Sequence, residues 1–296
     1  MAGVPQRALP RFRQDLLERV PCAICGQDDT ATFVQGRGPR QIVRCKRDGL
    51  LFVNPRPVRE RLQVVGEQFV NERNRALFES QRDAMLRREA EAILAVKSGG
   101  ALLDVGCATG QFFKNFPASW RLFGVEPCLY AVEQAKGHYN AEVRHGSLIE
   151  ARWPAQSFDV VTIIDALYYF ADPLDDLREA GRILKSDGIL ALEIPGYTHK
   201  LLRDRGPLCL LLDRKWSRLD PDGRPLYHYS PRTLSLLLRK AGFIISKRLV
   251  EQAPLGRSGI ADAMNWAHYG FTRAVFGMTA GHLSLAAKEF YLCRKA

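Results

Sequence analysis

The chain contains 296 residues, of which 46% are hydrophobic and 25% are charged, and its formal net charge is +11. This length accommodates one large domain and a smaller one. The longest apolar clusters, such as Leu208 to Leu212 and Ala274 to Ala280, fall well short of the roughly 20 residues that cross a bilayer. The first residues, with Pro5, Pro10 and several arginines, do not form a secretory signal. The composition therefore argues against a membrane-spanning protein, and we expect a cytoplasmic one.

Residues 1–20 are predicted to be a loose arm with one short helical stretch from Arg11 to Arg19. The next segment, residues 21–57, carries three of the seven cysteines of the chain. An odd number of cysteines without a signal indicates reduced thiols rather than a disulfide framework.

The cysteines of residues 21–57 have the spacing of a metal site. Cys22 and Cys25 form a C-x2-C pair, and Cys45 follows after 19 residues, with Asp48 where a zinc ribbon has its last cysteine. A carboxylate oxygen can bind zinc, so this set of Cys22, Cys25, Cys45 and Asp48 is a candidate Zn²⁺ site. The alternative is a metal-free module held together by apolar packing.

Residues 58–97 have helical periodicity and Arg/Glu pairs at i, i+4 spacing, such as Arg87 with Glu91, which predicts linker helices. Two glycines, Gly99 and Gly100, then end the helix. The remaining residues, 98–296, are expected to form the main domain.

The most informative stretch of that domain is Ala101 to Gly110. A short apolar run ends at Asp104, and a turn follows in which Gly106 and Gly110 leave the backbone open to a ligand. The spacing lacks the first half of the Gly-x-Gly-x-x-Gly fingerprint, which argues against a dinucleotide and an NAD-dependent enzyme. A nucleoside site and a simple turn without ligand both remain open for this stretch alone.

A second strand ends at Glu126, 20 positions after Gly106, close to the spacing at which an acidic side chain meets ribose hydroxyls. Strands and helices then alternate, which predicts a parallel, doubly wound α/β sheet. The expected elements are a helix from Cys128 to His138, strands from Glu142 to Gly146 and Phe158 to Asp165, a helix from Pro173 to Leu184, and a strand from Gly188 to Pro195.

In four ordered segments the chain resembles the class I S-adenosylmethionine-dependent methyltransferases. They are Leu103 to Gly110, Gly124 to Pro127, Ser157 to Asp165 and Glu179 to Leu192. The resemblance covers roughly residues 80–250 and implies a Rossmann-like sheet of seven strands. Its last strand, Glu289 to Lys295, would run antiparallel. The segment of residues 21–57 likewise resembles the N-terminal zinc ribbon of some methyltransferases in this family.

The resemblance also implies the cofactor, S-adenosylmethionine, and the residues around it. The glycine loop would approach the methionyl part, Glu126 the ribose, and the segment after Gly146 the adenine, where Ser147 replaces the acidic residue common in the family. The candidate cofactor residues are Asp104, Gly106, Cys107, Gly110, Glu126, Pro127, Ser147, Leu148 and Asp165.

Catalytic residues are less clearly indicated. Tyr169 stands where many relatives carry a histidine, which removes an obvious general base. Tyr168 and Tyr169 could orient a substrate or face the sulfonium, or could be core aromatics. His228 aligns roughly with an active-site histidine of relatives, whereas His199 is interpreted as a surface residue without a role.

Two segments, residues 196–229 and 254–285, interrupt the pattern as mostly helical insertions. Between them, Ser230 and Pro231 begin a helix that ends before Gly242. Residues 196–296 carry 17 Lys and Arg against 7 Asp and Glu, whereas residues 101–195 carry 8 against 13. The resemblance places the substrate near the segments after residue 195, so the basic charge favours an anionic acceptor. A solvated arginine-rich surface is the alternative.

The resulting hypothesis is a methyltransferase for a small, anionic metabolite, such as a sugar nucleotide or a natural-product or polysaccharide intermediate. An RNA or protein methyltransferase and a non-catalytic cofactor-binding protein are the alternatives. No basic motif interleaved with aromatic residues supports nucleic acid as a partner. The sequence leaves the oligomeric state open.

Overall fold

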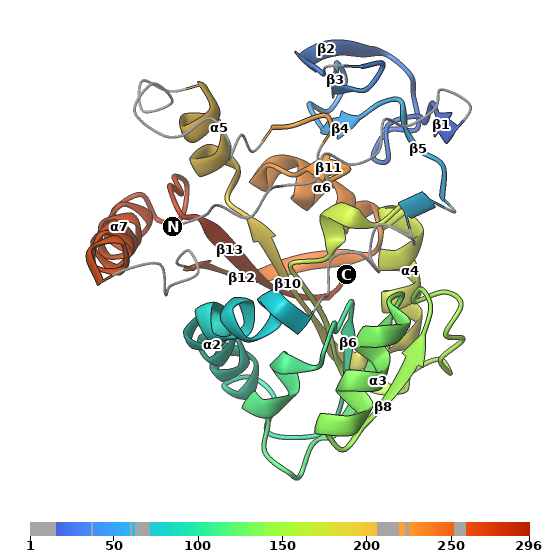
Figure 1. Cartoon of the computed structure of the whole chain (residues 1–296), viewed down its shortest axis with the longest axis vertical. Helices are drawn as coiled ribbons and strands as arrows, with labels where there is room; N and C mark the ends of the chain where they lie inside the picture. Colours follow the sequence, from blue (N-terminus) through green and yellow to red (C-terminus); the bar gives the residue numbers. More distant parts are fainter. Residues whose placement is uncertain are drawn as a thin grey trace.

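The computed structural model describes residues 16–36, 38–59, 61–62, 72–205, 219–222, 225–251 and 259–296. Its centre is a seven-stranded sheet with the order β12-β13-β10-β9-β6-β7-β8 (Figure 1). In that order the strands are Phe243–Glu251, Lys288–Lys295, Leu184–Pro195, Phe158–Ile164, Ala101–Val105, Arg121–Glu126 and Ala141–His145. β13 pairs antiparallel with both of its neighbours, while β10, β9, β6, β7 and β8 are parallel. The predicted Rossmann-like α/β sheet with an antiparallel last strand is thus confirmed.

Helices cover both faces of this sheet because alternate residues of each buried strand point to opposite sides. Leu103 and Val161 join the apolar cluster that contains α4 and α6, and their neighbours Leu102 and Val160 join the cluster that contains α2 and α3. The helices are α2 (Glu72–Leu94), α3 (Leu129–His138), α4 (Pro173–Ile183), α5 (Tyr197–Arg205), α6 (Pro231–Lys240) and α7 (Gly259–Met278), with short turns η2 (Gln111–Asn115) and η3 (Leu167–Tyr169).

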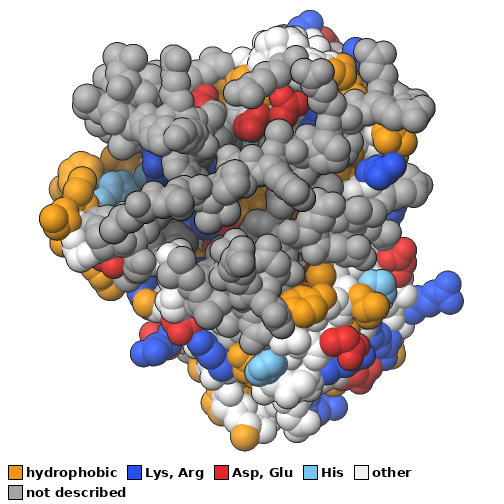
Figure 2. Space-filling view, in the orientation of Figure 1, with side chains coloured by type: hydrophobic (Ala, Val, Ile, Leu, Met, Phe, Trp, Pro, Cys, Tyr) orange, Lys and Arg blue, Asp and Glu red, His pale blue; other side chains and the backbone are white. Residues whose placement is uncertain are grey.

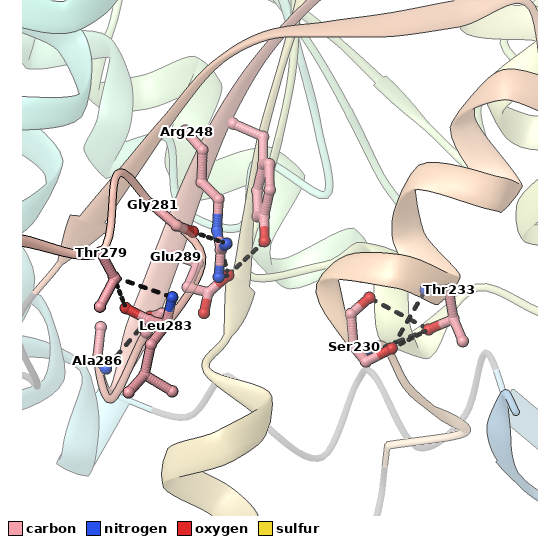
Figure 3. A network of polar contacts seen from close by, with 10 residues as sticks. Ser230, Thr233, Arg248, Thr279, Gly281, Leu283, Ala286 and Glu289 are labelled. Carbon is pink, nitrogen blue, oxygen red and sulfur yellow. Dashed lines mark hydrogen bonds and ion pairs between the residues drawn. The ribbon is translucent and has the colours of Figure 1, made fainter. Parts of the chain in front are cut away.

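The start of α6 follows the predicted capping pattern. The Ser230 side chain accepts from the Thr233 amide at 3.2 Å, and the Thr233 hydroxyl accepts from the Ser230 amide at 2.9 Å (Figure 3). These two bonds satisfy backbone donors that an uncapped helix leaves open, and Pro231 at the first helical position has no donor to satisfy.

The N-terminal segment forms a separate small sheet of the order β11-β4-β3-β2. Its strands are Tyr227–His228, Leu51–Val53, Gln41–Cys45 and Thr30–Gln35. The edge strand β11 comes from the segment that the sequence predicted to be a helical insertion. Within the described residues of this segment, only α5 is an α-helix. Strand β11 pairs with β4, so that Tyr227 lies opposite Phe52 and His228 lies opposite Leu51.

The predicted helix at the end of the N-terminal arm is wrong where the structure describes it. Leu17–Glu18 forms strand β1, which pairs antiparallel with β5 (Arg56–Pro57). The Val58 amide adds a hydrogen bond to the Leu16 carbonyl, so this backbone finds its partners across a ladder rather than along a helix. The beginning of that prediction, Arg11 to Asp15, lies outside the described residues.

Buried Arg56 links this segment to the chain after η3 and to strand β11. Its guanidinium donates to the Ala171 carbonyl, to the Tyr227 hydroxyl at 3.2 Å and to Glu18 at 2.9 Å. One arginine thereby holds together strand β1, the segment after η3, and strand β11.

Within the described residues, no helix is both long enough and apolar enough to cross a bilayer.

Candidate functional site

The glycine loop lies at the carboxyl end of β6, where ligands bind in open parallel sheets. Gly106 has φ 76° and Gly110 has φ 81°, values in the left-handed region that favours glycine. A Cβ on Gly106 would lie 2.9 Å from the Cβ of Ala166, and one on Gly110 would lie 2.8 Å from the Tyr139 ring. The loop therefore needs glycine at both positions for conformation and for space.

Glu126, at the end of β7, is nearly buried and reaches back to the loop. One carboxylate oxygen accepts from the Ala108 amide and the other from the Cys128 amide, each at 3.0 Å. Burial raises the pKa of this carboxyl, while the two amide donors lower it. The arrangement ties the loop after β6 to the turn after β7 and leaves lone pairs on both oxygens for a further donor.

Asp104 is a buried residue of β6. Its Oδ1 accepts from the Thr162 hydroxyl of β9 at 2.6 Å, and burial raises the pKa of the carboxyl to about 7. Cys107 is also buried, and its sulfur would lie 2.7 Å from a Cβ on Gly124. Its thiol thus occupies the space above this glycine within the core, and burial raises its pKa well above the usual value.

Three further predicted cofactor residues differ in their surroundings, and two of them, Ser147 and Leu148, belong to the segment predicted beside the adenine. Leu148 is fully buried in the core, and Pro127 is half-buried with its carbonyl accepting from His145 at 2.9 Å. Ser147 pairs with Glu150, which accepts from its amide at 2.8 Å and from its hydroxyl at 2.7 Å. A carboxylate is therefore present at this turn although the residue after Gly146 is serine.

Asp165 follows β9 with φ 58°, an unusual value for a residue with a side chain. Its carboxylate accepts from the Tyr168 hydroxyl and the Lys288 ammonium, and Arg82 lies 3.7 Å away. Although burial opposes ionisation, these two cations hold its pKa well below the usual range. Lys288 also lies 2.7 Å from Glu193 of β10, so the ammonium joins two strand ends.

A cavity lies beside Asp165, and the sequence analysis did not predict that its lining residues come together. Its lining is rich in aromatic and basic side chains and consists of Tyr168, Ile194, Pro195, Tyr197, Lys200, Tyr227, His228 and Tyr229. It lies at the same carboxyl edge as the glycine loop, because Tyr168 follows Ala166, whose side chain meets Gly106.

His228 is buried, and its Nδ1 lies 3.1 Å from the Lys200 Nζ. An ammonium can only donate, so this contact makes Nδ1 an acceptor and assigns the imidazole proton to Nε2. Nε2 has no hydrogen-bond partner among the described residues. Burial, and then the charge of Lys200, lowers the pKa of His228 well below its usual value. The histidine is neutral and presents one N–H.

The two predicted catalytic tyrosines have different environments. The Tyr168 ring lines the cavity, while its hydroxyl is held by Asp165. Tyr169 is 38% exposed, and its ring lies 4.4 Å from that of Tyr168. His199 of α5 contacts the ring of His268 of α7 at 5.2 Å. Sequence reasoning missed Lys200 and Tyr197, for which the one available signal is their position just after the strand that ends at Pro195.

The predicted metal ligands converge. One ligand atom from each of Cys22, Cys25, Cys45 and Asp48 lies within 4.8 Å of every other. The Cys22 sulfur is 3.2 Å from the Asp48 carboxylate, and the sulfurs of Cys25 and Cys45 are 3.5 Å apart. A tetrahedron with 2.3 Å Zn–S bonds has edges of about 3.8 Å, so the donor set fits a zinc ion.

The sheet order and the glycine loop at the carboxyl end of β6 together define a Rossmann-like α/β protein. A family model described as a methyltransferase domain matches residues 78–247, which is more than half of the chain. The chain therefore belongs to this methyltransferase family.

Two curated relatives are similar to parts of the chain. A tRNA U34 carboxymethyltransferase from Desulfotalea psychrophila is 28% identical over 57% of this chain and 54% of its own length. A 27-O-demethylrifamycin SV methyltransferase from Amycolatopsis mediterranei is 29% identical over 34% of this chain and 40% of its own length. The chain thus spans about half, or less, of the length of these relatives.

A solved structure from Thermotoga maritima, described as a SAM-dependent methyltransferase, superposes with a TM-score of 0.52. The match covers 79% of this chain and 100% of the other at 21% identity, and it supports the fold.

Proposed function

We propose that this chain is an S-adenosylmethionine-dependent methyltransferase whose acceptor is a small molecule carrying a negative charge. The observation that carries the acceptor class is the pair Lys200 and His228 in the cavity beside the glycine loop. The family membership and the loop geometry support the cofactor.

In the proposed complex, S-adenosylmethionine supplies a methyl group already activated on a sulfonium. The chain then has to bind and orient the acceptor and to exclude water from the site, because proximity and orientation of the reactants provide most of the rate. Gly106 and Gly110 let the backbone approach the cofactor, and Glu126 accepts from the ribose hydroxyls with the lone pairs that its two amide donors leave free. Asp104, Cys107, Pro127, Ser147, Leu148 and Asp165 complete the proposed surroundings.

The acceptor cavity suits an anion for an electrostatic reason. Lys200 supplies a positive charge, and the Nε2–H of His228 supplies a buried donor without a partner among the described residues. A buried donor without a partner is costly, so a carboxylate or phosphate oxygen placed there would relieve that cost. We infer that His228 acts as a hydrogen-bond donor that positions the acceptor, rather than as a general base.

We also propose that Cys22, Cys25, Cys45 and Asp48 hold a structural zinc ion, in which all four positions are filled by protein. The site is not near the reacting atoms in this proposal. Its effect on the acceptor cavity would pass through β4 and β11, since His228 pairs with Leu51.

The test of the acceptor class uses tritium-labelled cofactor and matched pairs of acceptors: sugar nucleotides against free sugars, and carboxylic acids against their amides. Methyl transfer should favour the charged member of a pair. Lys200→Met should raise KM for that acceptor at least about tenfold with little change in kcat, as expected for a lost charged contact. Lys136→Met, on α3, is the matched control. Equal turnover of charged and neutral members would overturn the assignment.

A second candidate is an RNA methyltransferase, which the tRNA-modifying relative and the basic last third of the chain favour. It predicts labelled RNA as product and an RNA affinity that falls steeply with salt. If neither RNA nor any small acceptor is methylated while the cofactor still binds, the alternative of a non-catalytic cofactor-binding protein is the one supported.

A further inference from the structure

Helix α7 has one face that packs on the protein and another that faces outward. The inward residues recur every three or four positions and include Tyr269 and Thr272, which are buried. The Tyr269 ring lies 5.3 Å from the guanidinium of Arg88, which in turn pairs with Glu251 of β12 at 2.7 Å. The helix is thus fixed against α2 and the edge of the sheet.

The segment after α7 is also fixed to the sheet. Arg248 of β12 donates to the Gly281 carbonyl at 2.9 Å and to Glu289 of β13 at 2.8 Å (Figure 3). Because both the body of α7 and the segment that follows it are anchored, the outward face is presented on a rigid element.

That outward face is apolar along its length. Four of its side chains are large and 59% to 79% exposed, and small residues lie beside them. The large ones are Ile260, Met264, Phe271 and Met278, and the small ones are Ala263, Ala267, Gly270, Ala274 and Gly277. Trp266 is not part of this face, because its ring packs 5.9 Å from that of Tyr269. In Figure 2 hydrophobic side chains gather at the left edge, where Figure 1 places α7. We refer to these residues as the α7 face.

The area of the α7 face is at the upper end of what a monomer exposes. Side chains of this size present on the order of 150 to 250 Å² each, so four of them at these exposures amount to roughly 430 to 710 Å². The largest apolar patch of a typical monomer is about 300 to 600 Å². A stable protein interface buries about 800 Å² on each partner, which the α7 face approaches before its small residues are added.

We propose that the α7 face binds the same face of a second copy of this chain, giving a two-fold symmetric dimer. A helix that lies on a membrane surface has a polar face rich in Lys and Arg turned to water, whereas the charged residues of α7 are Asp262 and Arg273 and its inward face is packed on protein. The small residues allow two helices to approach closely, and a face of this kind is complementary to itself under two-fold symmetry.

Light scattering after size-exclusion chromatography tests the dimer at micromolar concentration. The wild-type chain should have twice the mass of 33.3 kDa, and Phe271→Glu should weaken dimerisation at least about tenfold by placing a charge in the apolar contact. Val96→Glu, at a position that is 51% exposed outside α7, should remain dimeric. Thermal unfolding at low concentration checks that both variants are folded. A monomeric wild-type chain would overturn the proposal.

Disulfide trapping locates the contact. A side chain on Gly270 has nothing within 4 Å, and the same holds for Gly137 on the exposed side of α3. Gly270→Cys lies near the middle of the α7 face, so mild oxidation should link two copies, while Gly137→Cys should stay unlinked.

The last experiment tests binding to lipid by co-sedimentation with phosphatidylcholine vesicles that contain phosphatidylglycerol. Binding by the wild-type chain that Phe271→Glu abolishes would assign the face to a lipid surface and overturn the dimer.

Discussion

The cofactor half and the acceptor half of the proposed site are built in different ways. The cofactor half is a backbone structure: Gly106 and Gly110 shape one contiguous loop, and Glu126 ties this loop to the turn after β7 through the amides of Ala108 and Cys128. The acceptor half is made of side chains that come from segments far apart, with Lys200 on α5 and His228 on β11. The first depends on local conformation, and the second depends on how the small sheet and the insertion meet.

The zinc proposal gives the largest expected effect, and its test should show that the cofactor half does not depend on the metal site. Cys45→Ser should remove the metal and lower the free energy of unfolding by at least about 3 kcal/mol, because structural zinc contributes folding energy. S-adenosylmethionine affinity should change less than about threefold, since the glycine loop belongs to the other sheet. Metal analysis, urea unfolding and calorimetry measure the three quantities.

Asp48→Cys is the matched control for the metal site. It completes a four-cysteine set, so it should keep about one zinc per chain. A wild-type chain purified without metal, or Cys45→Ser with undiminished zinc, would show that packing alone holds the segment together.

Glu126→Ala should act mainly on the cofactor half of the site, in contrast to Cys45→Ser. It removes an acceptor for the ribose and leaves the amides of Ala108 and Cys128 without their partner. We expect cofactor affinity to fall roughly 100-fold, the product of two charge-assisted hydrogen bonds of about 1.5 kcal/mol each. Titration calorimetry measures this, with exposed Glu142→Ala as control. Unchanged affinity would disprove the ribose assignment.

The pH dependence of stability tests the burial of Asp104. Its pKa is about 7 in the folded chain and about 3.9 in an unfolded one, so the folded state holds the proton more tightly. The contribution of this group to the free energy of unfolding therefore falls as pH rises from about 4 to about 7. Asp104→Asn cannot ionise, so between pH 5 and pH 8 it should gain on the order of 2 kcal/mol relative to the wild type. A constant difference in urea unfolding across this range would contradict the shift.

The smallest effect concerns the acceptor half and needs no knowledge of the acceptor. Lys200→Met removes the charge next to Nδ1 of His228 and should raise the pKa of this histidine, which burial still holds below its usual value. NMR titration of the histidine ring protons measures the change, and Lys136→Met should leave it unaltered. A pKa of His228 that is the same in both variants would contradict the Lys200 contact.

The sequence by itself was enough for the parallel strands of the sheet, because strand and helix periodicity and glycine positions are local signals. The number of seven strands and the antiparallel last strand were implied by the family resemblance. The sequence also named the four metal candidates by spacing, and Gly106, Gly110 and Glu126 by their positions at strand ends. It mistook the end of the N-terminal arm for a helix, since the pairing of Leu17–Glu18 with β5 is a long-range event.

Only the tertiary structure brought Lys200 to His228, because that contact requires α5 and β11 to meet across the cavity. The same is true of Asp165, whose ion pair with Lys288 joins residues 123 positions apart, and of the outward face of α7. Periodicity shows that a helix has an apolar stripe, but not which stripe the rest of the fold leaves uncovered, since that depends on which other elements pack against it.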